Sequence, residues 1–141
     1  MMREATRLII EDGKDLIFIK RTKKINGSPS VFYVLPGGYL EEGETFEEAG
    51  IREVKEELSV DIQIDGFLTE EYNEDLDKLE RFYFAHIVSG KLKIGTEHEM
   101  KNMTIDSENG LYEIYRINKK EIGAYKILPI SIKDRLVATY I

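Results

Sequence analysis

The chain has 141 residues and a formal net charge of −7, with 42% hydrophobic and 33% charged residues. This size and balance are typical of a globular protein that buries a core, and we expect residues 1–141 to form a single domain. Because the sequence contains no cysteine, it excludes a disulfide framework and a thiolate metal site. No signal peptide and no apolar run of about 18 residues is present, which predicts a cytoplasmic protein without a membrane partner. The negative charge argues against a nucleic-acid partner, because such a partner requires a basic face.

Apolar and alternating runs predict strands, in chain order, at Arg7–Glu11, Leu16–Lys20, Val31–Leu35, Asp61–Leu68, Lys78–Val88 and Leu111–Ile117. The turn dipeptide Asp12-Gly13 separates the first two strands as in a hairpin. The polar segment Lys23–Ser30 contains glycine and proline, so we expect a loop there with Asn26-Gly27 at its tip. In the fifth strand, strict alternation predicts Phe82 and Phe84 on one face and Tyr83 and Ala85 on the other.

A first helix is predicted to begin just after Gly43. Thr45 and Glu48 have the spacing of a capping box. The apolar stripe that should face the core is formed by Ile51, Val54 and Leu58.

A second helix is predicted from about Ser131, where Ser131 and Asp134 offer another capping box. Strands at the start, a long helix in the middle and a helix at the end suggest an α/β protein with a mixed sheet between helices.

The first helix carries the most informative residues of the chain. Glu53, Glu56 and Glu57 stand at i, i+3 and i+4, so their carboxylates converge on one face. Like charges at this spacing repel by a few tenths of a kcal/mol per pair. A divalent cation would relieve the repulsion, and Mg2+ and Mn2+ prefer carboxylate and water oxygens.

An ordinary solvated acidic face is the competing interpretation, and it suits the remaining glutamates of the segment, which are Glu41, Glu42, Glu44, Glu47 and Glu48. Gly50 argues against it for the three convergent carboxylates. A helical glycine costs about 0.5–1 kcal/mol relative to alanine. We therefore expect a loop or a ligand to approach the helix closely on that side.

The whole segment Gly38–Val60 resembles the signature of the Nudix hydrolase family, G-x(5)-E-x(7)-R-E-U-x-E-E-x-G-U, in which U is a bulky aliphatic residue. Glu44, Arg52 and the three convergent glutamates occupy the specified positions. The sequence departs from the pattern at Ser59, where the family has a glycine that ends the helix in a left-handed turn.

The resemblance implies an α/β/α sandwich and the Mg2+-dependent hydrolysis of a pyrophosphate bond in a nucleoside diphosphate linked to another moiety. Glu53, Glu56 and Glu57 would hold Mg2+, with Mn2+ as an alternative. Glu53 is our first choice for the general base, although the glutamate with this role varies across the family. Arg52 and Glu44 would hold the loop against the helix, and helical spacing also brings Arg52 within reach of Glu48 and Glu56.

Further site residues are expected outside the signature. Arg21 is placed like a basic residue that many Nudix proteins use near the phosphates, and Gly37 and Gly38 would shape the loop beside them. Phe32 and Tyr33 could provide a stacking surface for a base. A carboxylate beyond the long hairpin often completes the metal site in this family, and we expect Glu97, rather than Glu99, in that role.

The resemblance implies a small-molecule nucleotide as the partner and a monomer or homodimer as the assembly. A proline about fifteen residues past the signature accompanies ADP-ribose preference in the family, and Tyr72–Lys78 contains none. A nucleoside triphosphate or a related nucleotide is therefore the first expectation for the substrate. The alternative is a non-catalytic Nudix domain that binds a nucleotide or nucleotide sugar, although the intact glutamate trio favours catalysis.

Overall fold

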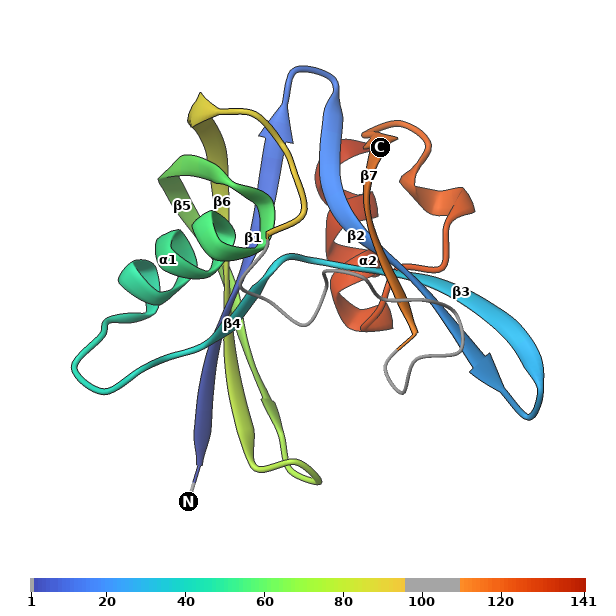
Figure 1. Cartoon of the computed structure of the whole chain (residues 1–141), viewed down its shortest axis with the longest axis horizontal. Coiled ribbons are helices and arrows are strands. Elements are labelled where there is room, and N and C mark those ends of the chain that lie inside the picture. The colour runs from blue at the N-terminus through green and yellow to red at the C-terminus, as the bar shows by residue number, and fades with distance from the viewer. Residues whose placement is uncertain (1, 96–109) are drawn as a thin grey trace.

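The computed structural model describes residues 2–95 and 110–141 (Figure 1). Its elements are, in order, β1 (Arg3–Asp12), β2 (Asp15–Ile25), β3 (Ser28–Val34), β4 (Gly37–Tyr39), α1 (Phe46–Leu58), β5 (Val60–Asn73), β6 (Lys78–Gly90), β7 (Leu111–Asn118), the 3₁₀ turn η1 (Ile122–Ala124) and α2 (Ile130–Tyr140). Each predicted strand is present, and most extend beyond their predicted ends. Within the described ranges, no helix has the length and apolar character that crossing a bilayer requires.

The strands form one mixed sheet that opens between β1 and β2. β1 pairs with β6 in parallel, whereas its pairing with β2 is antiparallel and covers only Ile10–Asp12 against Asp15–Ile17. Beyond these residues β1 pairs with β4, while β2 pairs with β3 on one side and β7 on the other. The continuous β3–β4 segment therefore passes between the diverging strands (Figure 1).

Each face of the sheet has its own hydrophobic core. β1 shows why, because successive side chains of a strand point to opposite faces. Leu8 and Ile10 pack with Val54 and Leu58 of α1. Ile9 packs on the other face with Leu136 of α2. The α/β/α sandwich with a mixed sheet between helices is thus confirmed.

The alternation predicted for β6 is also confirmed. Phe82 and Phe84 belong to the core under α2, whereas Tyr83 and Ala85 belong to the core under α1.

The predicted loop at Lys23–Ser30 is wrong except at its tip. β2 and β3 extend through this segment and pair up to Ile25 and Ser28. Only Asn26 and Gly27 form the turn, with φ angles of 53° and 81°. These positive angles are those of a two-residue hairpin turn, which Asn-Gly adopts readily.

The predicted capping box of the second helix is also wrong. α2 begins at Ile130 after Pro129, and no side chain caps it. The Ser131 hydroxyl instead donates to Glu71 of β5 at 2.9 Å. The sequence has the spacing of a capping box, but the Ser131 side chain makes a tertiary hydrogen bond instead of capping the helix.

The N-terminus of α1 is as predicted. Thr45 Oγ1 accepts from the Glu48 N–H, and the Thr45 N–H donates to Glu48 Oε1. This pairing satisfies two of the N–H groups that a helix start leaves without partners.

The buried face of α1 differs from the predicted stripe, because Ile51 is exposed while Val54 and Leu58 are fully buried. Gly50 is buried, and a Cβ there would lie 2.8 Å from Thr6 Cγ2 of β1. The close approach expected at Gly50 therefore comes from the sheet itself, not from a loop or a ligand over the acidic face.

The C-terminus of α1 explains how the signature tolerates Ser59. Ser59 adopts the left-handed conformation (φ 65°, ψ 24°) that glycine usually provides at this position. Its hydroxyl donates to the Lys93 carbonyl at 3.0 Å. The N–H groups of Lys93 and Gly95 donate to the carbonyls of Leu58 and Glu57. The segment after β6 thus satisfies carbonyls at the helix end.

We predict that Ile51→Ala lowers the free energy of unfolding by less than about 1 kcal/mol, since the side chain faces solvent. Val54→Ala removes fewer carbon atoms but should cost about 2 kcal/mol, because Val54 is fully buried. Urea denaturation of both variants checks the order. A larger loss for Ile51→Ala would contradict the observed orientation of the helix.

Candidate active site

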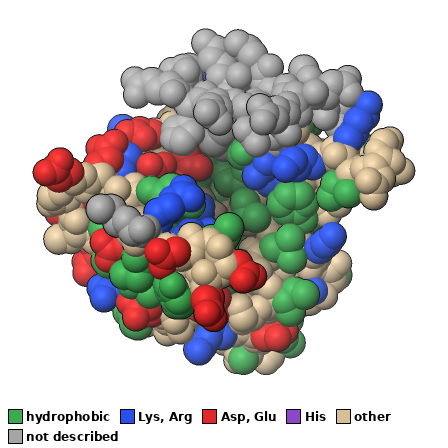
Figure 2. Space-filling view, turned by 90° about the horizontal axis from the view of Figure 1, so that it is seen from below, with side chains coloured by type: hydrophobic (Ala, Val, Ile, Leu, Met, Phe, Trp, Pro, Cys, Tyr) green, Lys and Arg blue, Asp and Glu red, His purple; other side chains and the backbone are tan. Residues whose placement is uncertain are grey.

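A cavity of about 490 Å³ lies where the sheet opens. Its lining brings together residues from β1, β2, β3, β4, α1 and β7, which are Arg7, Ile19, Arg21, Val34, Leu35, Gly37, Gly38, Tyr39, Leu40, Glu41, Glu53, Glu57 and Tyr112. Figure 2 shows a hollow on this side of the molecule with hydrophobic side chains inside and basic side chains beside it. The separation of β1 from β2 therefore creates a concave site next to the acidic face of α1.

Arg52 joins the acidic loop to the helix. Its Nε and Nη2 donate to both oxygens of Glu44 at 2.7 and 2.9 Å, and Nη2 also donates to the Tyr39 carbonyl. Its Nη1 donates to Glu53 at 2.9 Å and to Glu56 at 3.2 Å. The hydrogen bond to Glu44 is the main cause of the raised pKa of Arg52, and the same bond lowers the pKa of Glu44. Arg52 thus stays charged and braces Glu44 and Glu56 as expected, but not Glu48, which caps the helix.

Glu53 lies against the backbone of β4. A Cβ built on Gly38 would fall 2.4 Å from the carboxyl carbon of Glu53. Gly38 has no positive φ, so glycine is required here for space and not for backbone conformation. The absence of a side chain lets the buried Glu53 carboxylate occupy this position.

Glu57 is held by the neighbouring glycine. The Gly37 N–H donates to Glu57 Oε1 at 2.9 Å. Burial raises the pKa of Glu57 to about 7, against the lowering effect of this hydrogen bond. The charges of Glu53 and Glu56 also raise the pKa, while that of Arg7 lowers it. Glu57 is therefore a carboxyl group for which the charged form is costly unless a cation is near.

The three glutamates differ in access. Glu53 and Glu57 are each 8% exposed. The Glu56 side chain is 33% exposed and lies on the outer part of the same face. The trio thus runs from a buried end beside the glycines to an end that solvent reaches.

These residues fit a divalent cation by their chemistry. In residues 2–95 and 110–141, no group of three or more His, Asp and Glu side chains is already arranged around one point. Nevertheless, Glu53, Glu56 and Glu57 provide the oxygen donors that Mg2+ and Mn2+ prefer. The raised pKa of Glu57 also means that a bound cation would stabilise the carboxylate against burial and its acidic neighbours.

Arg21 lines the cavity, as expected for a residue that contacts phosphates. Its guanidinium lies 3.8 Å from the ring centre of Tyr112 and 5.6 Å from that of Phe32. Phe32 is half-buried beside Arg21 and does not line the cavity. Burial lowers the pKa of Arg21, which remains a cation at neutral pH.

The stacking role predicted for Tyr33 is wrong. Its ring is 8% exposed and belongs to the core under α2. It packs at 5.2 Å, between ring centres, against both Tyr115 and Tyr125. A nucleobase therefore cannot reach either face of this ring, because residue 33 points away from the cavity side of β3.

Glu97 and Glu99 lie outside the described residues. The described chain stops at Gly95, whose N–H donates to the Glu57 carbonyl at 2.8 Å. The expected role of Glu97 thus stays a prediction.

Sequence reasoning missed Arg7 and Tyr112. Both line the cavity, and Arg7 does so from the middle of β1. A signal was available, because Arg7 alternates with Ala5 and Ile9, which are fully buried on the same face of the strand. A single cationic side chain among the buried apolar residues of one strand face indicates that the position has a role other than packing.

We predict that Glu57 makes the metal-free protein less stable as pH rises. Between its ordinary pKa of 4.5 and about 7, the folded protein keeps a proton that the unfolded chain has released. Stability should therefore fall by up to about 3 kcal/mol across this interval. Urea denaturation in EDTA at about pH 5 and about pH 8 measures the change. Glu57→Gln should remove most of it, and Glu47→Gln, on the exposed side of α1, should not. An unchanged pH dependence in Glu57→Gln would contradict the assignment.

We also predict that Gly38→Ala weakens Mn2+ binding by about 10- to 100-fold, because the new methyl group displaces the Glu53 carboxylate. Titration followed by electron paramagnetic resonance measures the affinity. Gly43→Ala is the control, since a Cβ there has open space but φ is +84°. It should cost about 1 kcal/mol of stability and leave Mn2+ affinity unchanged. Equal affinities in the two variants would refute the role of Gly38.

Comparisons with known proteins agree with this geometry. A family model described as the NUDIX domain matches residues 1–124. The ADP-ribose pyrophosphatase of Methanocaldococcus jannaschii is 32% identical over 93 residues, which are 63% of this chain and 53% of that protein. A Nudix hydrolase from Clostridium acetobutylicum is 33% identical over 94 residues, 62% of this chain and 45% of that protein. The chain spans about half the length of these curated relatives.

A solved structure supports the fold. The NUDIX hydrolase from Nitrosomonas europaea superposes with a TM-score of 0.69 at 19% identity, over 96% of this chain and 68% of that one. At this identity the similarity concerns the fold alone. Together with the match of the family model over residues 1–124, the comparisons show that this chain belongs to the Nudix family.

Proposed function

We propose that the protein hydrolyses a pyrophosphate bond in a nucleoside diphosphate linked to another moiety, and that it needs a divalent cation. One observation carries the proposal. Glu53 and Glu57 are buried and line a cavity whose lining also includes Arg7 and Arg21. A site with carboxylates for a cation and arginines for an anion suits a substrate that is a metal-bound pyrophosphate.

Glu53, Glu56 and Glu57 would hold Mg2+ or Mn2+, and Glu97 remains a candidate for a further ligand. The cation, when bound, would withdraw charge from the phosphoryl oxygens and lower the pKa of water.

The other residues of the site bind, orient or move protons. Arg52 and Glu44 fix the loop through two hydrogen bonds, which holds Glu53 and Glu56 in place. Gly38 leaves room for the Glu53 carboxylate beside β4, and Gly37 donates its N–H to Glu57. Arg21 would bind the phosphates, because its guanidinium is oriented by the Tyr112 ring. Glu53 remains our choice for the base that accepts a proton from the attacking water.

Two classes of nucleotide are candidates for the substrate. A nucleoside triphosphate or a related nucleotide is the first, since Tyr72–Lys78 has no proline. ADP-ribose is the second, because one relative is named for its hydrolysis. A binding domain without turnover is the alternative from another class, and the intact trio of glutamates argues against it.

Turnover on a substrate panel tests the proposal. Nucleoside triphosphates, ADP-ribose and other nucleotide sugars would be incubated with Mg2+, and phosphate, pyrophosphate and nucleotide release would be measured. We predict that Glu56→Gln lowers kcat by at least about 100-fold while the fold is kept, because it removes a charged oxygen donor at the accessible end of the trio. Glu47→Gln is the matched control and should retain activity, since Glu47 lies on the exposed side of the same helix.

The outcomes separate the alternatives. Tight nucleotide binding without hydrolysis of any substrate would favour the binding domain. Near-normal turnover by Glu56→Gln would refute the assigned metal role even if the wild type is an enzyme.

A further inference from the structure

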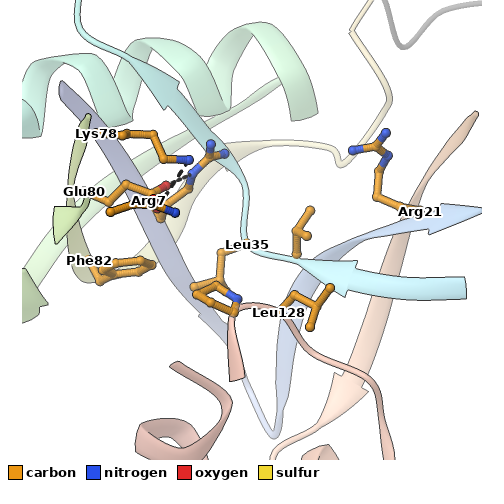
Figure 3. A pocket seen from close by; sticks show the side chains of 10 residues that line it. Arg7, Arg21, Leu35, Lys78, Glu80, Phe82 and Leu128 are labelled. Carbon is orange, nitrogen blue, oxygen red and sulfur yellow. Dashed lines mark hydrogen bonds and ion pairs between the residues drawn. The ribbon is translucent and has the colours of Figure 1, made fainter. Parts of the chain in front are cut away.

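The site described above continues into a second cavity of about 460 Å³. The two cavities share Arg7, Arg21, Val34 and Leu35 in their linings. Figure 3 shows Arg7, Lys78, Glu80 and Phe82 on one side of the second cavity and Arg21 on the opposite side, with Leu35 and Leu128 between them. Arg7 therefore stands at the junction of the two spaces, facing Arg21 across the opening of the sheet.

Arg7 is held in place by β6. The parallel register of β1 and β6 sets Ala5 opposite Glu80 and Arg7 opposite Phe82. Glu80 therefore lies two residue pairs from Arg7, on the same face of the sheet, and its Oε2 accepts from Arg7 Nε at 2.9 Å. Its other oxygen lies 3.6 Å from Lys78 Nζ. Glu80 is thus shared by two cations.

The orientation of Arg7 leaves its terminal nitrogens for another partner. Among the described residues, only Nε of Arg7 makes a hydrogen bond, and none joins Nη1 or Nη2 to them. The Arg7 side chain is 25% exposed and Glu80 is 15% exposed. Two cations and one carboxylate leave a net positive charge in a half-buried cavity wall, where an anion would be bound more strongly than at an open surface.

We propose that Arg7 binds the pyrophosphate of the substrate through its terminal nitrogens, and that Glu80 is a positioning residue that fixes the guanidinium with the help of Lys78. The inference rests on the proposed function, and it adds a second arginine opposite Arg21. A planar guanidinium donates two parallel hydrogen bonds to phosphate oxygens, and holding it beforehand reduces the entropy lost on binding. The charge of Arg7 also acts on Glu57, so the anion would be bound next to the proposed metal ligands.

A purely structural ion pair between β1 and β6 is the competing explanation. The protein contains a matched pair for comparison, because Arg81 Nε donates to Glu70 Oε1 at 2.7 Å between β6 and β5. That pair is about 40% exposed and lines neither of the two cavities. Glu70→Gln therefore reports the effect of breaking a cross-strand ion pair, while Arg81→Lys also alters the contact of this guanidinium with the Phe46 ring, whose centre lies 4.2 Å away.

The experiment compares Arg7→Lys, Glu80→Gln and the double variant with the controls Arg81→Lys and Glu70→Gln. Binding of an adenosine diphosphate with a methylene-bridged pyrophosphate is measured by calorimetry with Mg2+, and kcat and KM are measured on the best substrate of the panel.

We expect Arg7→Lys and Glu80→Gln each to weaken binding and raise KM by about 10-fold, with a smaller effect on kcat. The double variant should be no worse than Arg7→Lys alone, since Glu80 acts through Arg7. Glu80→Asp should restore part of the affinity, and the controls should stay within about twofold of the wild type.

The results also separate this inference from the proposed function. Wild-type protein that binds the analogue, with unchanged affinity in Arg7→Lys or Glu80→Gln, would overturn the inference alone. Independent effects that multiply in the double variant would overturn the positioning role of Glu80. Wild-type protein that neither binds the analogue nor turns over any substrate would overturn both proposals.

Discussion

The contact between the carboxylates of α1 and the glycines of β4 is the constraint on which the rest of this structure depends. Gly37 donates its N–H to Glu57, and Gly38 leaves the space that the Glu53 carboxylate occupies. Two buried acids can lie side by side here because the backbone supplies a donor and room, and because Arg52 donates to Glu53. The pairing of β4 with β1 and the packing of Gly50 on β1 bring the helix and the glycines to this distance. Packing on the sheet therefore determines the position of α1, and α1 in turn positions the carboxylates of the site.

The charged side chains that line the cavities differ in character from the net charge of the whole protein. The net charge of −7 predicts an acidic surface that should repel phosphates. The cavity linings nevertheless include Arg7, Arg21 and Lys78. Arg52 balances part of the charge of the acidic loop without entering the cavity lining. An anionic substrate would thus meet cations inside the cavity although the whole molecule is negative.

The sequence predicted the features that local spacing determines and missed those that tertiary contacts determine. The capping box at Thr45 and the alternation in β6 depend on residues close in the chain, and they are confirmed. The bracing of Glu44 by Arg52, which the family resemblance implied, is also observed. Ile51 was predicted to face the core because its spacing fits a helical stripe, but the β1 side chains pack on Gly50 instead. Tyr33 illustrates the same limit, since the face of β3 that meets the cavity depends on how β3–β4 enters between β1 and β2. Ser131 shows that a motif can be present while a distant residue, Glu71, takes its hydrogen bond.

The central claim is that Glu53, Glu56 and Glu57 hold a divalent cation next to the cavity. Anomalous diffraction from crystals soaked in Mn2+ tests it most directly. The account predicts an anomalous peak within about 2.5 Å of oxygens from at least two of these three carboxylates. Anomalous peaks only at other places on the protein, with none at the three glutamates, would contradict it.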